Sequence, residues 1–211
     1  DESFLTYGQL QIPCSSTAAA ALAQIEYKVE DAMQSGYDAV NKLDQHTLFC
    51  WVAKILYGAV FNEIQVGLRQ SILSGETMNF SQVLVQKFRN LHAMLQSILV
   101  PMEFEVTNPY RIEIFEVDND ENTFLYRDEI NTLVFSLRMN NFAIIATLQD
   151  NGTNAIYHED VLQKVKGKKL HPIQFEEICA RYFYSAYLFN RLPEYTFMET
   201  VDKIFIEPMP L

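Results

Sequence analysis

Residues 111–117 read Arg-Ile-Glu-Ile-Phe-Glu-Val, and this stretch decides the fold class because the hydrophobic period of the chain changes here. Polar and apolar side chains largely alternate in it, as they do in a strand that buries one face. Downstream, residues 123–127, 132–139 and 142–149 are predicted to form further strands. Residues 142–148 are almost wholly apolar, which predicts a strand in the middle of the sheet or under a helix.

Polar turn residues separate the predicted strands. Asn140-Asn141 can adopt the positive φ of a tight hairpin turn, and Asp150-Asn151-Gly152 follows the last strand. The sequence therefore predicts an antiparallel β-meander.

Upstream of this sheet, apolar residues recur at the helical period instead. Residues 45–65 are apolar on nearly all faces of a helix, which predicts that other elements enclose it. A helix that starts near Ser81 carries a continuous apolar seam over residues 84–98 and ends at Pro101. Four helices are expected before the sheet. The first is capped by Thr17 and runs to about Ser35, with Gly36 just past its end, and the second covers residues 45–65 and is capped by Asp44. A short third covers 66–74 and stops at Gly75, and the fourth is the one from Ser81.

Two more helices are expected after the meander. One lies near residues 159–166, and a longer one runs from about Pro172 to Asn190, because proline is pre-shaped for the first helical position. An extended piece over 203–207 is a candidate to join the sheet, and residues 4–12 form an extended lead-in. The expected fold is α+β: a single compact unit over residues 1–211, in which a helical part (1–101) packs against an antiparallel β-meander with C-terminal helices (102–211).

The charge of the chain restricts its partners. Hydrophobic residues make up 49% and charged residues 20%, which is typical of a globular protein. The formal net charge is −11, so the surface as a whole repels phosphates and DNA would have to meet a local basic patch. The one basic cluster is Lys164, Lys166, Lys168 and Lys169, which is either a nucleic-acid contact or a set of cations that complements a helix end.

The cysteines and the apolar runs bear on location. Three cysteines at irregular spacing favour a reducing compartment over a disulfide framework. Because no run of 18 apolar residues is present, no membrane span is expected, and the predicted location is cytoplasmic. The start, Asp1-Glu2-Ser3-Phe4, lacks an initiator Met and a signal-like stretch and reads as the edge of a fragment.

Several groups of residues are candidates for a metal site. His46 and Cys50 are four apart on a predicted helix and could face one ion, but two ligands do not make a site, and a satisfied histidine near the helix start with an inert buried thiol is the favoured explanation. His158, Glu159 and Asp160 cluster by a predicted helix start, where the helix dipole favours acids in any case. Glu176 and Glu177 resemble surface helix charges, with Glu177 placed to pair with Arg181.

Other catalytic patterns are not evident in the sequence. It contains no glycine-rich phosphate loop and no Gly-x-Ser-x-Gly elbow, and no cysteine lies near a helix start with an evident histidine partner. The aromatic run Tyr182-Phe183-Tyr184, with Tyr187 and Phe189, could stack nucleic-acid bases or could simply supply core and rim.

Short motifs at both ends of the chain resemble bacterial proteins of the HNH type, which carry a treble-clef zinc knuckle. In those proteins a Cys-x-x-Cys-Asn knuckle opens a helix that ends in Leu-x-x-Ile-Glu, and residues 14–26 look like this junction. Cys14 stands in the place of the first ligand, with Thr17 and Ala18 in the places of the second Cys and the Asn. Residues 51–58 are similar to a Trp-x-x-Lys-Ile-x-Tyr-Gly helix, and residues 170–177 to a segment in the C-terminal parts of these proteins.

The resemblance implies a nuclease connection without a complete metal centre in this chain. Only Cys14 remains of the two thiolates, and the His and acidic residues that would hold a catalytic metal would lie before residue 1. The expected function is therefore the accessory or inactivated body of an HNH-type nuclease-related protein, with no cofactor in this chain and with zinc or magnesium in a complete relative.

Two other classes of function stay open. The apolar seam over residues 84–98 could serve a protein partner or a homo-oligomer instead of the core, which would make the chain a non-enzymatic interaction module. A small-molecule enzyme with a pocket between helices and sheet is the third alternative, although no acid/base constellation marks it.

Overall fold

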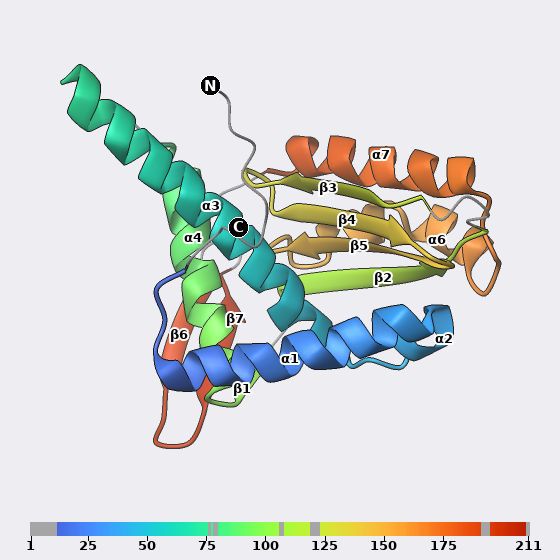
Figure 1. The fold of residues 1–211 in the computed structure, drawn as a ribbon, viewed down its shortest axis with the longest axis horizontal. Coiled ribbons are helices and arrows are strands. Elements are labelled where there is room, and N and C mark those ends of the chain that lie inside the picture. The colour runs from blue at the N-terminus through green and yellow to red at the C-terminus, as the bar shows by residue number, and fades with distance from the viewer. Residues whose placement is uncertain are drawn as a thin grey trace.

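The computed structural model describes residues 12–75, 77, 80–105, 108–118, 123–190 and 195–209, so the predicted lead-in lies outside the described part up to residue 11. Its fold is α+β, as expected (Figure 1). The helices are α1 (Ser16–Ser35), α2 (Tyr37–Val40), α3 (Gln45–Ser74), α4 (Gln82–Leu95), the 3₁₀ turn η2 (Gln96–Ile98), α5 (Thr153–Tyr157), α6 (Glu159–Val165) and α7 (Pro172–Leu188). The strands are β1 (Met102–Phe104), β2 (Tyr110–Glu116), β3 (Leu125–Glu129), β4 (Val134–Met139), β5 (Phe142–Leu148), β6 (Tyr195–Glu199) and β7 (Ile204–Pro208).

The predicted meander forms a four-stranded antiparallel sheet in the order β2-β5-β4-β3. Every residue of β5 is buried, and β5 lies between β2 and β4, which confirms the central place expected from its composition. Met139 pairs with Phe142, so Asn140 and Asn141 form the tight turn, and Asn140 has a φ of 48°. Different helices cover the two faces of this four-stranded sheet (Figure 1). Phe175 of α7 packs on one face, and α1, α3 and α4 share a larger core with the other.

Helix α3 corrects one sequence prediction. Residues 45–74 form one helix of 30 residues, where a break after residue 65 was expected. The stretch contains only two glycines, Gly58 and Gly67, and a single glycine costs a helix only about 1 kcal/mol, which is too little to break it. Asp44 caps the helix as predicted, since its Oδ1 accepts from the Thr47 amide at 2.7 Å, and Gly75 ends it in the left-handed region.

Helix α3 is also long and apolar enough to cross a membrane, although its most apolar window is 50% buried within this fold. The core helix of a soluble protein has the same length and composition, and the first part of α3 has this role here. Leu48, Phe49, Val52 and Leu56 are fully buried in the larger core. The fold is therefore compatible with a soluble protein.

Two other expectations for the helical half are revised. The cap of α1 is Ser15, whose Oγ accepts from the Ala18 amide at 3.2 Å, and Thr17 lies within the first turn. The seam on α4 faces the protein's own core, where Leu91 and Met94 are almost completely buried. Most of the seam is therefore used by the protein's own core, while Leu95 and Ile98 at its end are only partly buried.

The extended piece near the C-terminus does not join the meander. β7 pairs in parallel with β1 and antiparallel with β6, in a separate three-stranded sheet of order β1-β7-β6. Ile206 of β7 is fully buried in the larger core, so this small sheet is tied to the helical half. Pro172 begins α7 as predicted, and His171 completes a capping box with Gln174.

Candidate functional site

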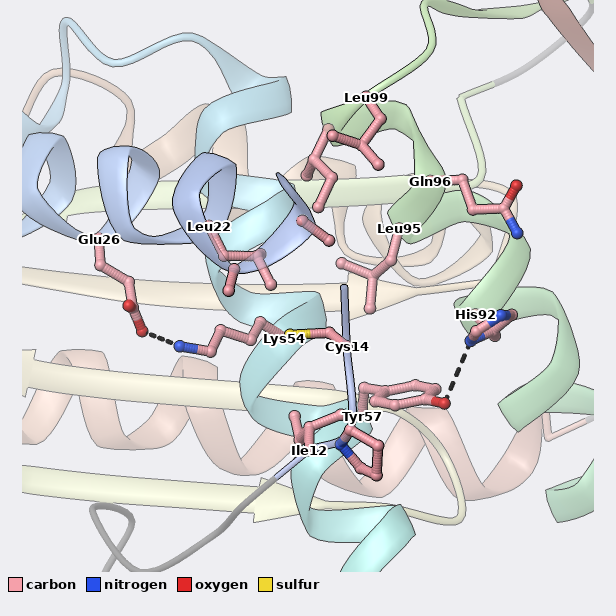
Figure 2. Close-up of a pocket in the computed structure, with 14 residues that line it drawn as sticks. Ile12, Cys14, Leu22, Glu26, Lys54, Tyr57, His92, Leu95, Gln96 and Leu99 are labelled. Carbon is pink, nitrogen blue, oxygen red and sulfur yellow. Dashed lines mark hydrogen bonds and ion pairs between the residues drawn. The ribbon is translucent and has the colours of Figure 1, made fainter. Parts of the chain in front are cut away.

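An open apolar pocket of about 320 Å³ lies where α1, α3 and α4 meet (Figure 2). The apolar side chains around it come from the start of the described chain, from α1 and from the end of α4 with the turn that follows. They arrive there because α1 presents residues at helical spacing to α3 and α4. The apolar lining consists of Ile12, Pro13, Ala18, Ala19, Leu22, Leu95, Ile98 and Leu99.

Two polar pairs lie on opposite sides of this pocket (Figure 2). Lys54 of α3 forms an ion pair with Glu26 of α1. Tyr57 of α3 shares a hydrogen bond of 3.1 Å with Nδ1 of His92 on α4, and burial raises the pKa of Tyr57. Tyr57 also stacks on Phe88 at a ring-centroid distance of 4.5 Å, which fixes the ring. Because Glu26, Lys54, Tyr57 and His92 are paired with one another and most of the lining is apolar, the pocket is suited to an apolar side chain more than to chemistry.

Cys14 lies on the rim of this pocket, exposed and directly before the cap of α1. The resemblance places a knuckle ligand at the opening of a helix, and Cys14 and Thr17 flank that point here. Thr17 has a hydroxyl where a knuckle has its second thiolate. Among the described residues, no group of three His, Cys, Asp or Glu side chains is placed to hold a metal ion.

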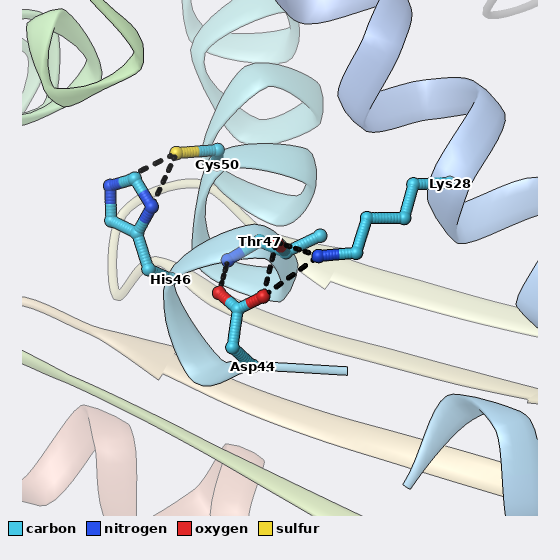
Figure 3. Close-up of polar contacts among 5 residues, drawn as sticks. All are labelled: Lys28, Asp44, His46, Thr47 and Cys50. Carbon is cyan, nitrogen blue, oxygen red and sulfur yellow. Dashed lines mark hydrogen bonds and ion pairs between the residues drawn. The ribbon is translucent and has the colours of Figure 1, made fainter. Parts of the chain in front are cut away.

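The candidate pair His46 and Cys50 forms a hydrogen-bonded cluster at the start of α3 (Figure 3). Nε2 of His46 lies 2.9 Å from Oγ of Ser97 and 3.6 Å from Sγ of Cys50. Burial raises the pKa of the Cys50 thiol to about 11, and burial also lowers the pKa of His46. A buried protonated thiol is a poor nucleophile, and two ligand atoms alone do not make a metal site, so this geometry favours the structural explanation of the pair.

His158 belongs to a second buried network, between α5 and α7. Its Nε2 lies 2.9 Å from Oγ of Ser185, which in turn donates to Oδ1 of Asn154 at 2.6 Å. Asn154 donates to Asp150 at 2.9 Å. Ser185 is only 1% exposed, so no substrate can reach its hydroxyl, while Glu159 is at the exposed start of α6. This network could not be predicted from the sequence, because Asn154 and Ser185 come from elements that are distant along the chain.

The four candidate lysines lie in the last turn of α6 and just after it. Lys164 is in its last turn, and Lys169 pairs with Asp118 at 2.8 Å. Lys166 and Lys168 line a groove of about 520 Å³ whose walls also contain the carboxylates of Glu113, Glu116 and Glu159. The basic cluster is therefore placed among acidic side chains.

The aromatic run on α7 is divided between core and surface. Tyr182 is buried, with its ring 4.8 Å from that of His158, whereas Tyr184 and Tyr187 are exposed. Glu177 pairs with Arg181 at 2.7 Å, as the spacing predicted, and Glu176 pairs with Arg127 at 3.0 Å. Both glutamates act as ion-pair partners on the surface of α7.

Comparisons of this chain with protein-family models, with curated proteins and with solved structures found no match.

Proposed function

We propose that this chain is the non-catalytic body of an HNH-type nuclease-related protein in the bacterial cytoplasm, and that its task is to bind another polypeptide. The observation that carries this proposal is the open apolar pocket between α1, α3 and α4, which lies beside Cys14. A pocket with apolar walls and few polar groups is typical of a binding site.

The nuclease relationship rests on the position of Cys14. An exposed cysteine directly before a long helix is where the first ligand of a knuckle stands in the proteins that this chain resembles. The role is proposed to be non-catalytic because the buried nucleophiles are held in their unreactive forms. Cys50 has a pKa of about 11, and Ser185 is closed off from solvent.

A neutral amphipathic peptide tests the binding role. The probe is a fluorescein-labelled helix of about 14 residues with leucines on one face and glutamine and serine elsewhere. Ala19 is exposed and lines the pocket, so Ala19→Trp fills the pocket without disturbing the core. The adjacent Ala20 is exposed and does not line it, which makes Ala20→Trp the matched control.

We expect fluorescence anisotropy to show that Ala19→Trp weakens peptide binding about tenfold or more, which is the loss of one well-buried apolar contact. Ala20→Trp should stay within about twofold of the parent chain, since it leaves the contact intact. Equal binding by the two variants would contradict the assignment of the pocket.

A cleavage assay tests the non-catalytic part separately. Supercoiled plasmid incubated with the purified chain and Mg²⁺, Mn²⁺ or Zn²⁺ should remain intact. Metal-dependent cutting that copurifies with the chain would overturn this part and leave the binding assay unaffected.

DNA binding through the four lysines is tested in parallel with a labelled duplex. If these lysines contact phosphate, Lys166→Glu and Lys168→Glu will weaken binding and reduce its salt dependence. Because the nearby carboxylates oppose phosphate, we expect only weak binding by the parent chain.

A further inference from the structure

A second pocket of about 570 Å³ adjoins the first along α1, and Glu26 lines both. Its lining differs in character from that of the apolar pocket. Two carboxylates, two aromatic rings and two thioethers line it together with smaller groups: Glu26 and Glu30, Tyr27 and Trp51, and Met33 and Met139. Glu26 already pairs with Lys54, so Glu30 is the carboxylate that would meet an incoming cation.

The residues of α1 that line the two pockets share one face of the helix. In the second pocket they follow the spacing of i, i+3, i+4 and i+7, from Ala23 through Glu30 to Met33 and Gln34. In the first they begin at Ala18 and Ala19. The stretch from Ala19 to Met33 is about 21 Å long at the helical rise, which is the length of a helix of about 14 residues.

The chemistry of the second pocket is that of a cation site. Aromatic faces attract an ammonium or guanidinium group through the ring quadrupole, and carboxylates beside them add charge attraction. Methionine sulfurs are polarizable and adapt to the bound shape. The net charge of −11 draws a positively charged partner toward the protein from a distance.

We propose that the two adjoining pockets together bind a basic amphipathic segment of a partner protein, with an apolar side chain in the first pocket and a lysine or arginine in the second. This inference rests on the proposed binding function and adds the chemistry of the partner. The acidic pocket selects the charge, and the apolar pocket supplies the anchor.

The test compares three labelled peptides that share the same leucines and carry lysine, glutamine or glutamate at all other positions. Glu30→Lys reverses the charge in the second pocket, and Asp31→Lys is the matched control, because Asp31 is the next residue, is exposed and does not line the pocket. Tyr27→Ser removes an exposed ring from the same pocket.

The lysine peptide should bind the parent chain about tenfold more tightly than the glutamine peptide, which corresponds to one cation–π contact and one or two exposed ion pairs. Glu30→Lys and Tyr27→Ser should each reduce that preference severalfold, and Asp31→Lys should change it less than Glu30→Lys does. The preference should shrink as salt is added, since these charges are exposed.

The outcomes separate the two proposals. If the glutamine peptide binds in a manner sensitive to Ala19→Trp but the lysine peptide binds no more tightly, the binding function stands and the basic partner is wrong. If no peptide binds, both are wrong. A fourth peptide carries the lysines but no leucines. If it binds as tightly as the lysine peptide with leucines, charge alone suffices for binding and the two-pocket arrangement is wrong.

Discussion

Lys87 is the residue whose environment departs furthest from what its type suggests. It is only 4% exposed, and its amine donates to the Asn131 carbonyl at 2.9 Å and to Oδ1 of Asn190 at 2.6 Å. Burial lowers the pKa of Lys87 to about 8, although the charges of Asp150 and Glu129 oppose this shift. The lysine thus joins α4 to the β3–β4 connection and to the residues after α7.

The lowered pKa sets a testable pH dependence. Between the folded pKa of about 8 and the ordinary value of 10.5, the unfolded chain binds more protons than the folded one, so unfolding free energy rises with pH. From pH 7 to pH 10.5, the unfolding free energy of the parent chain should therefore rise by up to roughly 3 kcal/mol relative to that of Lys87→Met. Urea unfolding at several pH values measures it, and a difference that is constant over that range would contradict the assignment.

Neither Lys87 nor the Ser185 network could be predicted from the sequence. A lysine on a helix is usually solvated, and Lys87 stands among residues of ordinary spacing. Its partners lie 44 and 103 positions further along the chain, so only the tertiary fold brings them together. His46 and Cys50, by contrast, are four residues apart, and their proximity could be predicted from the sequence alone.

At the scale of elements, the start of α3 is held by Asp44 (Figure 3). Partial burial raises the pKa of Asp44, but hydrogen bonds from Lys28 and Thr47 outweigh it and hold the pKa well below the usual value of 3.8. Asp44→Ala should destabilise the protein by about 1 kcal/mol at pH 7, the usual effect of losing a cap.

The sign of the pH effect follows from the lowered pKa. The stabilisation by Asp44 is complete above pH 3.8 and is lost as the pH falls through the lower folded pKa, so the deficit of Asp44→Ala should shrink in strong acid. Asp44→Asn keeps a capping side chain and should lose less, because the exposed pair with Lys28 contributes little. Thermal unfolding checks both variants, and an equal loss for Asn and Ala would contradict the capping role.

Gly36 joins the helical half to the sheet. Its φ is 90°, and a Cβ at this position would lie 2.6 Å from Oδ1 of Asn141, which accepts from the Tyr37 amide. Gly36→Ala should therefore destabilise the protein by more than 1 kcal/mol, through both backbone strain and loss of this contact. Chemical denaturation measures the effect, and a neutral or stabilised variant would show that the contact is unimportant.

Elements with a clear period were predictable, and short pairing elements were not. The alternation in 111–117 and the apolar run in 142–148 predicted β2 and β5. β1 has only three residues and β6 shows no buried alternation, so neither carries a pattern, and their pairing with β7 joins distant parts of the chain. The missing break in α3 was a different error, since Gly67 does not interrupt that helix, which ends only at the left-handed Gly75.

At the scale of the whole molecule, the first pocket arises from the arrangement of three helices, and the second from α1, α3 and the end of β4. Cys14 was predicted from a resemblance, but the pocket beside it depends on how α1 crosses α3 and α4, which no spacing in the sequence reveals. The projecting end of α3 is a further exposed apolar region, with Ile72 80% and Leu73 87% exposed. If this end mediates self-association, light scattering will show a dimer that Leu73→Lys dissociates, whereas a monomeric parent chain would exclude that role.

The central claim is that the pocket between α1, α3 and α4 receives a polypeptide. The most direct measurement is the mapping of backbone amide NMR shifts as the lysine–leucine peptide is added to the labelled chain. We predict that the shifts will cluster along the face of α1 from Ala19 to Met33 and on Tyr57, His92 and Leu99 across the pocket. Shifts confined to the groove beside Lys166 and Lys168, or no shifts at saturating peptide, would contradict the claim.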